Sequence, residues 1–204
     1  TTLDDNFTVP FAAAILLPLL FGLGGAGANA AGLELRIVLG LLVNTIFAWL
    51  ALRSKSIDRM GALSAVLIGT VITASFGLQG FALMAGFFLV GSTVTKLGYA
   101  RKAALGIAQE KGGGLGWQSD FANGGIPELL SLFGLLSEGP MRTAYLIAYA
   151  AAVATAAADT CSSEIGKAYG KRTFLITTFR PVPAGTEGAV SIEGTLGGLF
   201  GSAF

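Results

Sequence analysis

Long apolar runs are the feature that most constrains how this chain can fold. Apolar residues make up 53% of the 204 residues, and charged residues only 12%, about half the share typical of soluble domains. A run of about 20 apolar residues can cross a bilayer as an α-helix. The apolar runs cover residues 9–23, 33–52, 60–78, 81–95, 121–136, 141–158 and the beginning of a seventh at 195–204. The sequence therefore predicts an all-α, polytopic transmembrane bundle of six to seven helices, in which residues 1–204 form one integral membrane domain.

The basic residues are distributed unevenly among the links between these runs. If each run crosses the membrane once, eleven of the thirteen lysines and arginines fall on one side, and only Arg36 and Arg142 fall on the other. Lysine and arginine are enriched in cytoplasmic loops. We therefore expect the basic loops to form the active face on the cytoplasmic side of a bacterial plasma membrane or an equivalent organelle membrane. The net charge of +1 gives no general attraction for nucleic acid, so we expect no such partner.

The chain contains no histidine. This excludes Ser-His and Cys-His nucleophile pairs, and it also excludes histidine metal sites. Any metal site must therefore use oxygen ligands, which favours Mg²⁺ over zinc.

The densest group of polar residues follows the sixth apolar run. No charged residue lies between 144 and 158, and the next residue is Asp159. A carboxylate in lipid is costly, so we expect Asp159 to face protein, water or an ion. Carboxylates hold hard metal ions, lysines bind phosphates, and glycines allow close approach of the backbone. A phosphate and metal site is one interpretation, and a helix end with ordinary snorkelling charges is the other. The candidates here are Asp159, Ser163, Glu164, Gly166, Lys167, Gly170 and Lys171.

Two shorter polar elements are weaker candidates. Ser92, Thr93 and Lys96 end the fourth apolar run, where they suit a phosphate or, alternatively, bond back to helix carbonyls while the lysine snorkels. Asn123 precedes two glycines and begins either a turn of the site or a plain loop.

Residues 171–194 are rich in threonine, phenylalanine, valine and isoleucine around Pro181 and Pro183. This composition predicts a short hairpin or extended flap over the cytoplasmic membrane face. The flap contains Gly185-Thr186-Glu187-Gly188. Its glycines permit close approach to a ligand, and Glu187 suits a metal or ribose contact. The same four residues would also make an ordinary turn.

Several motifs occur in a specific order: Gly91-Ser-Thr-Val-Thr-Lys-Leu-Gly, Ala122-Asn-Gly, Ala158-Asp-Thr-Cys-Ser-Ser-Glu-Ile-Gly, Leu175-Ile-Thr-Thr and Gly185-Thr-Glu-Gly-Ala-Val-Ser. From about Gly61 to its end, the chain resembles the phytyl-phosphate (prenyl-phosphate) kinase family of polytopic membrane proteins. The spacing of Asp159, the following glycines and Thr186-Glu187-Gly188 is more distantly similar to CTP-using dolichol kinases and CDP-diacylglycerol synthases.

The resemblance implies an enzyme that converts a prenyl (phytyl) monophosphate lipid to the diphosphate with a nucleoside triphosphate, CTP being favoured. A phosphate monoester is already anionic near pH 7, so the reaction needs no general base, and Mg²⁺ and lysines can screen the repulsion between two anions. A transporter of a phosphorylated or cationic solute is the alternative, but it leaves the long glycine-rich loops unexplained.

In this interpretation Asp159, Lys96 and Lys167 are catalytic, and Asp159 and Glu164 are the metal ligands. On a regular helix these two carboxylates point about 140° apart. Both reach one ion only if the helix breaks near Cys161; otherwise Glu164 serves a second ion or the lysines. The residues expected to bind substrate or nucleotide are Ser92, Thr93, Asn123, Ser163, Gly166, Gly170, Lys171, Thr186, Glu187 and Gly188.

Overall fold

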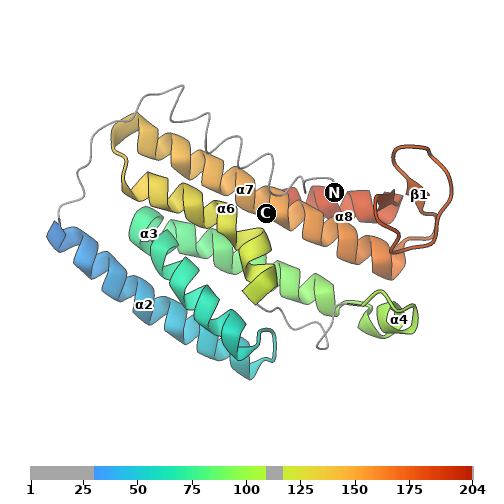
Figure 1. Ribbon diagram of the computed structural model, residues 1–204, viewed down its shortest axis with the longest axis horizontal. Helices are drawn as coiled ribbons and strands as arrows, with labels where there is room; N and C mark the ends of the chain where they lie inside the picture. Colours follow the sequence, from blue (N-terminus) through green and yellow to red (C-terminus); the bar gives the residue numbers. More distant parts are fainter. Residues whose placement is uncertain (1–29, 109–116, 204) are drawn as a thin grey trace. The chain divides into compact units, whose positions relative to one another are not determined.

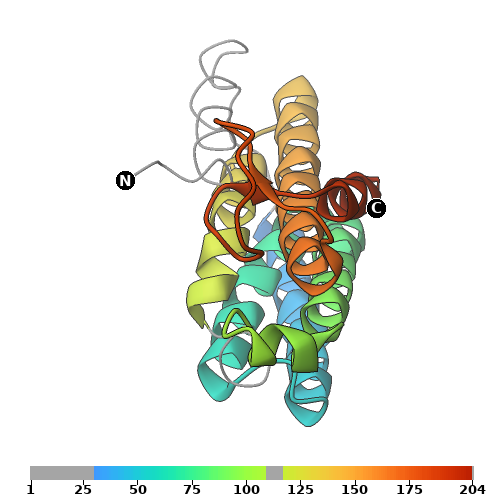
Figure 2. The same cartoon turned by 90° about the vertical axis from the view of Figure 1, so that its right-hand side faces the viewer.

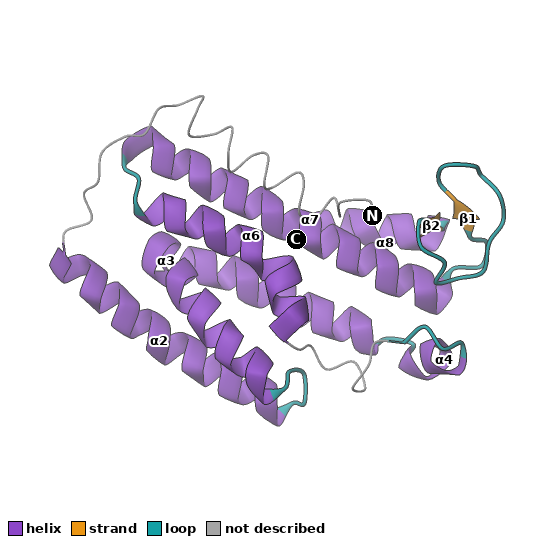
Figure 3. Cartoon of the chain, in the orientation of Figure 1, coloured by secondary structure: helices purple, strands orange, loops and turns teal. Residues whose placement is uncertain are grey.

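The computed structural model describes residues 30–108 and 117–203. Within them, α2, α3 and α7 are long and apolar enough to cross a membrane. The two short strands are the only non-helical elements of regular structure in this part of the chain (Figure 3). These findings confirm the predicted all-α, polytopic class. The elements are α2 (Ala30–Arg53), α3 (Arg59–Lys96), α4 (Tyr99–Ala104), α6 (Trp117–Leu135), α7 (Gly139–Tyr169), β1 (Phe174–Leu175), β2 (Ala189–Val190) and α8 (Ile192–Ser202) (Figure 1).

The helices follow the predicted apolar runs with two differences. The runs at 60–78 and 81–95 join in α3, which is broken at Gly77 and changes direction there (Figure 1). Gly77 has φ 70° and ψ −160°, a conformation that only glycine adopts readily. The run predicted to end at 158 continues as α7 to Tyr169, so the polar stretch after Asp159 is helical. The first predicted run, 9–23, lies outside the described residues.

The described residues form two compact units. The first contains α2, α3 as far as Ala85, α6, and α7 as far as Val153. The second contains α3 from Gly86, α4, α7 from Ala154, both strands and α8. Because α3 and α7 run through both units, the division does not follow element boundaries, and the single membrane domain stays a prediction.

In the first unit, side chains of α7 satisfy backbone carbonyls on either side of the break in α3. Arg142 donates to the carbonyl of Ser75 at 2.5 Å, and the hydroxyl of Tyr149 donates to that of Gly80 at 2.7 Å. Asn44 of α2 donates to Thr73 at 3.1 Å. An unsatisfied buried polar group costs free energy, so these bonds stabilise the chain around the break in α3.

In the second unit, α8 packs closely against the end of α7, with the strands beside them (Figure 2). The buried residues of α8 are Gly194, Gly197, Gly198 and Gly201. A Cβ atom at Gly201 would lie 2.6 Å from the carbonyl oxygen of Ala157, so this contact requires glycine. Ser191 begins α8 by accepting a hydrogen bond from the amide of Gly194 at 3.0 Å. This packing fixes the start of α8 against the polar end of α7.

The flap (residues 171–194) contains both strands. Phe174 pairs with Val190 and Leu175 with Ala189 in an antiparallel arrangement. The hairpin therefore returns the chain from the end of α7 to the start of α8. Its position on the cytoplasmic side stays a prediction.

Candidate functional site

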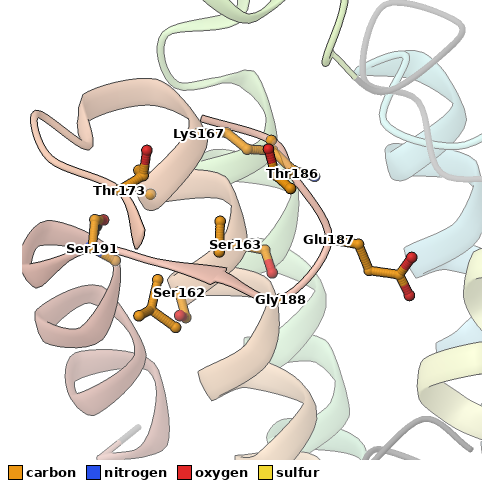
Figure 4. Close-up of a pocket in the computed structure, with 13 residues that line it drawn as sticks. Ser162, Ser163, Lys167, Thr173, Thr186, Glu187, Gly188 and Ser191 are labelled. Atoms are coloured by element: carbon orange, nitrogen blue, oxygen red, sulfur yellow. Dashed lines mark hydrogen bonds between the residues drawn. The ribbon is translucent and has the colours of Figure 1, made fainter. Parts of the chain in front are cut away.

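An open pocket of about 380 Å³ lies between the end of α7, the flap and the start of α8 (Figure 4). All of its lining residues belong to the second unit. They are Ser162, Ser163, Gly166 and Lys167 of α7, Thr173 and the continuous segment Gly185–Ser191 of the flap, and Gly194 of α8.

Regular helix geometry positions the α7 side of the pocket. Ser163 and Lys167 are four residues apart in an uninterrupted helix, so they share one face. Just after the helix, a Cβ atom at Gly170 would lie 2.5 Å from the carbonyl oxygen of Gly166 and 3.1 Å from the Oγ of Ser191, so glycine allows the close approach of the flap there. The other wall turns at Gly185 and Gly188, whose φ angles of 86° and 73° favour glycine over other residues.

Hydroxyl groups and one ammonium are among the polar groups that line the pocket. Ser162, Ser163 and Thr186 contribute hydroxyls, that of Thr186 donating to the carbonyl of Pro183 at 2.8 Å, and Lys167, which is 30% exposed, contributes the ammonium. Glu187 also lines the pocket, but its side chain points away from the other labelled side chains (Figure 4). Lysine and hydroxyl donors are typical ligands of phosphate oxygens, so the pocket is suited to a phosphorylated ligand.

A cluster of two lysines and one glutamate, of which Lys102 and Glu164 are buried, adjoins the pocket. The Glu164 side chain is 3% exposed, and its Oε2 lies 2.5 Å from the Nζ of Lys102. Its Oε1 lies 3.3 Å from the Nζ of Lys167. Lys102 is completely buried in α4 and also donates to the carbonyl of Thr95 at 2.8 Å. We call Lys102, Glu164 and Lys167 the lysine–glutamate cluster.

Lys102 was not among the site residues predicted from the sequence. Its neighbour Arg101 is exposed, whereas Lys102 is buried. Nothing in the local sequence marks this difference, because burial depends on which face of α4 meets α3 and α7.

The structure brings six of the predicted site residues together around the pocket: Ser163, Gly166, Lys167, Thr186, Glu187 and Gly188. Two others lie next to it. Gly170 packs against Gly166 and Ser191, and Glu164 contacts Lys167.

The remaining predicted residues do not line this pocket. Asp159 is exposed on α7, one turn before Ser163, and Lys171 is exposed just after the helix. Lys96 is exposed at the end of α3. Asn123 belongs to α6 in the first unit, and its side chain lies outside the described residues.

The hydroxyls of Ser92 and Thr93, near the end of α3, differ in exposure and in hydrogen bonding. Thr93 is exposed and donates back to the carbonyl of Leu89 at 2.7 Å, which is the structural alternative considered for this motif. Ser92 is buried, and its hydroxyl has no hydrogen-bond partner among the described residues. Buried hydroxyls are normally paired, so Ser92 is the member of this motif that retains capacity for another bond.

The carboxylates present fit Mg²⁺ only where a bound phosphate supplies some of the ion's oxygen ligands. Within the described ranges, no group of three or more His, Cys, Asp and Glu side chains could hold a metal. The helix does not break near Cys161, and both oxygens of Glu164 face lysines. Mg²⁺ commonly takes one or two protein carboxylates and completes its shell with substrate phosphates and water. Asp159 and Glu187 are exposed carboxylates in the same unit and suit that mode.

Three membrane-length helices define this chain as an integral membrane protein. It belongs to the integral membrane protein family DUF92, whose model matches residues 42–204. This match, together with the relatives described next, confirms the family predicted from the motifs.

Three curated relatives were compared with the chain. It is 42% identical over 133 residues to the membrane protein sll0875 of Synechocystis and 40% identical over 147 residues to the chloroplastic protein VTE6 of Arabidopsis thaliana. It is 32% identical over 168 residues to the membrane protein MJ0933 of Methanocaldococcus jannaschii. These alignments cover 65%, 71% and 82% of this chain and 52%, 44% and 68% of the relatives. The chain thus spans about half the length of the first two. No solved structure matches it significantly.

Proposed function

We propose that this protein is a membrane phosphotransferase that converts a prenyl monophosphate, phytyl phosphate in the first instance, to the diphosphate with a nucleoside triphosphate. The observation that carries the proposal is the composition of the pocket. Ser163 and Gly166 come from the Ala158–Gly166 motif of α7, directly followed by Lys167, and Thr186 and Glu187 come from the Gly-Thr-Glu-Gly motif of the flap. Two separate motifs of the prenyl-phosphate kinase pattern therefore line one pocket suited to phosphate.

The chemistry of this reaction matches what the chain offers. A prenyl monophosphate is largely ionised near pH 7, because the second pKa of such a group is about 6. It can therefore attack a phosphoryl group without a histidine base, and the chain has none. The barrier comes from bringing two anions together. Lys167 and the hydroxyl of Ser163 are proposed to hold phosphate oxygens and to reduce that repulsion, joined by the hydroxyl of Thr186 once it exchanges its bond to the carbonyl of Pro183 for the phosphate.

We propose Asp159 and Glu187 as the protein ligands of Mg²⁺. The ion, when bound, would neutralise charge on the phosphate oxygens. Glu164 is no longer proposed as a metal ligand, because α7 is unbroken and the sequence had left open that Glu164 then serves the lysines. Since both of its oxygens face lysines, it is proposed to pair with Lys102 and to lie beside Lys167 at the pocket. Lys96 and Lys171 remain proposed phosphate ligands for the parts of the two substrates outside the pocket.

The pocket is proposed to face the cytoplasm or the equivalent side of an organelle membrane. Lys171, Arg172 and Arg180 are exposed around the flap, and basic loops favour that side. The outer face of α8 carries exposed apolar residues, including Leu196 and Phe200. That face suits contact with lipid, so a prenyl chain could reach the pocket laterally from the bilayer.

The test is turnover by the purified full-length protein in detergent or nanodiscs. Phytyl, geranylgeranyl and farnesyl phosphates would each be combined with CTP, ATP, GTP and UTP, and diphosphate products would be measured by mass spectrometry. The proposal expects a prenyl diphosphate with at least one triphosphate, CTP being favoured. Solute flux in liposomes without nucleotide turnover would instead identify a transporter.

A further inference from the structure

Lys102 is the most deeply buried cation in the described part of the second unit, and its side chain is 0% exposed. Its ammonium contacts Glu164 at 2.5 Å, the carbonyl of Thr95 at 2.8 Å and the carbonyl of Val94 at 3.4 Å. Three acceptors match the three N–H donors of an ammonium. Burying an ion pair is expensive, and such a pair often contributes little net stability. Stability alone therefore gives little reason for this buried pair.

The charges of the lysine–glutamate cluster are not equally accessible. Two lysines share one carboxylate, so the cluster has a net charge of +1. Lys102 lies 2.5 Å from Glu164 and is inaccessible, whereas Lys167 lies 3.3 Å from it, is 30% exposed and lines the pocket. The surplus positive charge can therefore reach a ligand only through Lys167.

We propose that Lys102 is a positioning residue: it neutralises Glu164 and so leaves Lys167 able to bind a phosphate group in the pocket. The second oxygen of Glu164 faces Lys167 at the longer distance of 3.3 Å, so it competes only weakly with a ligand for that lysine while Lys102 is present. Lys102 also contacts two carbonyls at the end of α3, so the same side chain ties α3 to this face of α7. The inference rests on the proposed function only in taking the ligand to be a phosphate.

The proposal makes opposite predictions for the two members of the buried pair. Lys102→Met leaves Glu164 with Lys167 as its one cation among the described residues, so the net charge of the cluster falls to zero and Lys167 is retained by the carboxylate. Glu164→Gln frees Lys167 completely. Lys102→Met/Glu164→Gln removes both charges and restores the net charge of +1. If the pair were merely structural, both single variants would weaken ligand binding together with stability, because each removes one partner of the buried pair.

The experiment measures binding of inorganic tripolyphosphate, which stands for the phosphate chain of a nucleotide, to the purified full-length protein by calorimetry. We expect Lys102→Met to bind at least about tenfold more weakly than wild type, the effect of one lost charge-assisted contact. Glu164→Gln and the double variant should bind within about threefold of wild type, or more tightly. Arg101→Met is the matched control, because it removes an exposed charge from the adjacent position of α4.

Thermal unfolding of every variant separates binding from folding. If Lys102→Met binds tripolyphosphate as wild type does, or if wild type does not bind it, the proposal is overturned. If Lys102→Met cannot be purified, Glu164→Gln decides: weaker binding than wild type overturns the proposal, and equal or tighter binding supports it. Prenyl-phosphate turnover is measured separately. Its absence in a wild-type protein that shows the expected binding pattern would contradict the proposed function while supporting the role of Lys102.

Discussion

Lys102 and Glu164 are 62 positions apart in the sequence, and their side chains meet at 2.5 Å in the interior of the second unit. The contact joins the short helix α4 to the polar end of α7. On the other side of the same carboxylate lies Lys167, which lines the pocket. The buried pair is thus connected to the candidate ligand site through a single shared glutamate.

Lys167→Met should lower turnover by at least about a hundredfold, the scale of losing one strong electrostatic contact in a transition state. The physical reason is that Lys167 carries the accessible positive charge of the cluster. Steady-state kinetics with phytyl phosphate would measure the effect. Arg172→Met serves as the control, since Arg172 is exposed beyond the end of α7 and does not line the pocket. Equal activity of the two variants would contradict the assignment of Lys167.

Asp159→Asn should reduce Mg²⁺-dependent turnover by at least about a hundredfold. The substitution keeps the size of the side chain but removes the charge that a hard ion requires. A magnesium titration of turnover measures both the maximum and the concentration at half-maximum. Glu138→Gln removes an exposed carboxylate of the first unit and should leave the titration unchanged. A near-normal titration of the Asp159 variant would remove this residue from the site.

The enzyme should accept a prenyl monophosphate and refuse the free prenyl alcohol. An alcohol has a pKa far above 7, so its attack benefits from a positioned general base. The chain has no histidine, whereas a monophosphate arrives ionised and offers charge for Lys167 to orient. Product analysis with phytol and phytyl phosphate side by side makes the comparison. Conversion of phytol at an equal rate would assign the protein a dolichol-kinase type of reaction.

Gly201→Ala should destabilise the second unit by about 1–3 kcal/mol, the usual cost of overpacking. The new Cβ atom would lie 2.6 Å from the carbonyl oxygen of Ala157 and 2.9 Å from the Sγ of Cys161. Thermal unfolding in detergent would report the loss as a lower Tm. Gly125→Ala is the control: its added Cβ meets nothing within 4 Å, and it lies inside α6. Alanine is the better helix former, so this variant should be neutral or slightly stabilising.

Cysteines placed at Lys55 and Arg180 should react with an impermeant thiol reagent from the same side of the membrane. The expectation follows from the distribution of basic residues and the positive-inside rule. Labelling of sealed vesicles before and after permeabilisation measures it, with a cysteine at Arg36 as the expected opposite-side control. The native Cys161 is buried and should give little background. Labelling of the first two positions from opposite sides would contradict the predicted number of crossings.

The membrane class and the family could be predicted from the sequence, because both depend on local signals. Apolar runs of sufficient length indicate helices whatever their neighbours, and α2, α6 and α8 follow the predicted runs closely. The motifs indicated the family because their order and spacing are properties of the linear sequence. The pairing of the Asp159 region with the Thr186 region in one pocket was anticipated from this resemblance, not from local geometry.

Tertiary structure decided which polar side chains are buried and which meet. Arg101 and Lys102 are adjacent and chemically similar, yet one is exposed and the other completely buried, because α4 turns them toward different surroundings. The unbroken course of α7 directed Glu164 toward two lysines, an outcome that the sequence had left open beside shared metal binding with Asp159. Both results depend on contacts between segments distant in the chain. Local sequence carries the propensity of a helix to form, whereas the direction in which each charge faces depends on what packs against that helix.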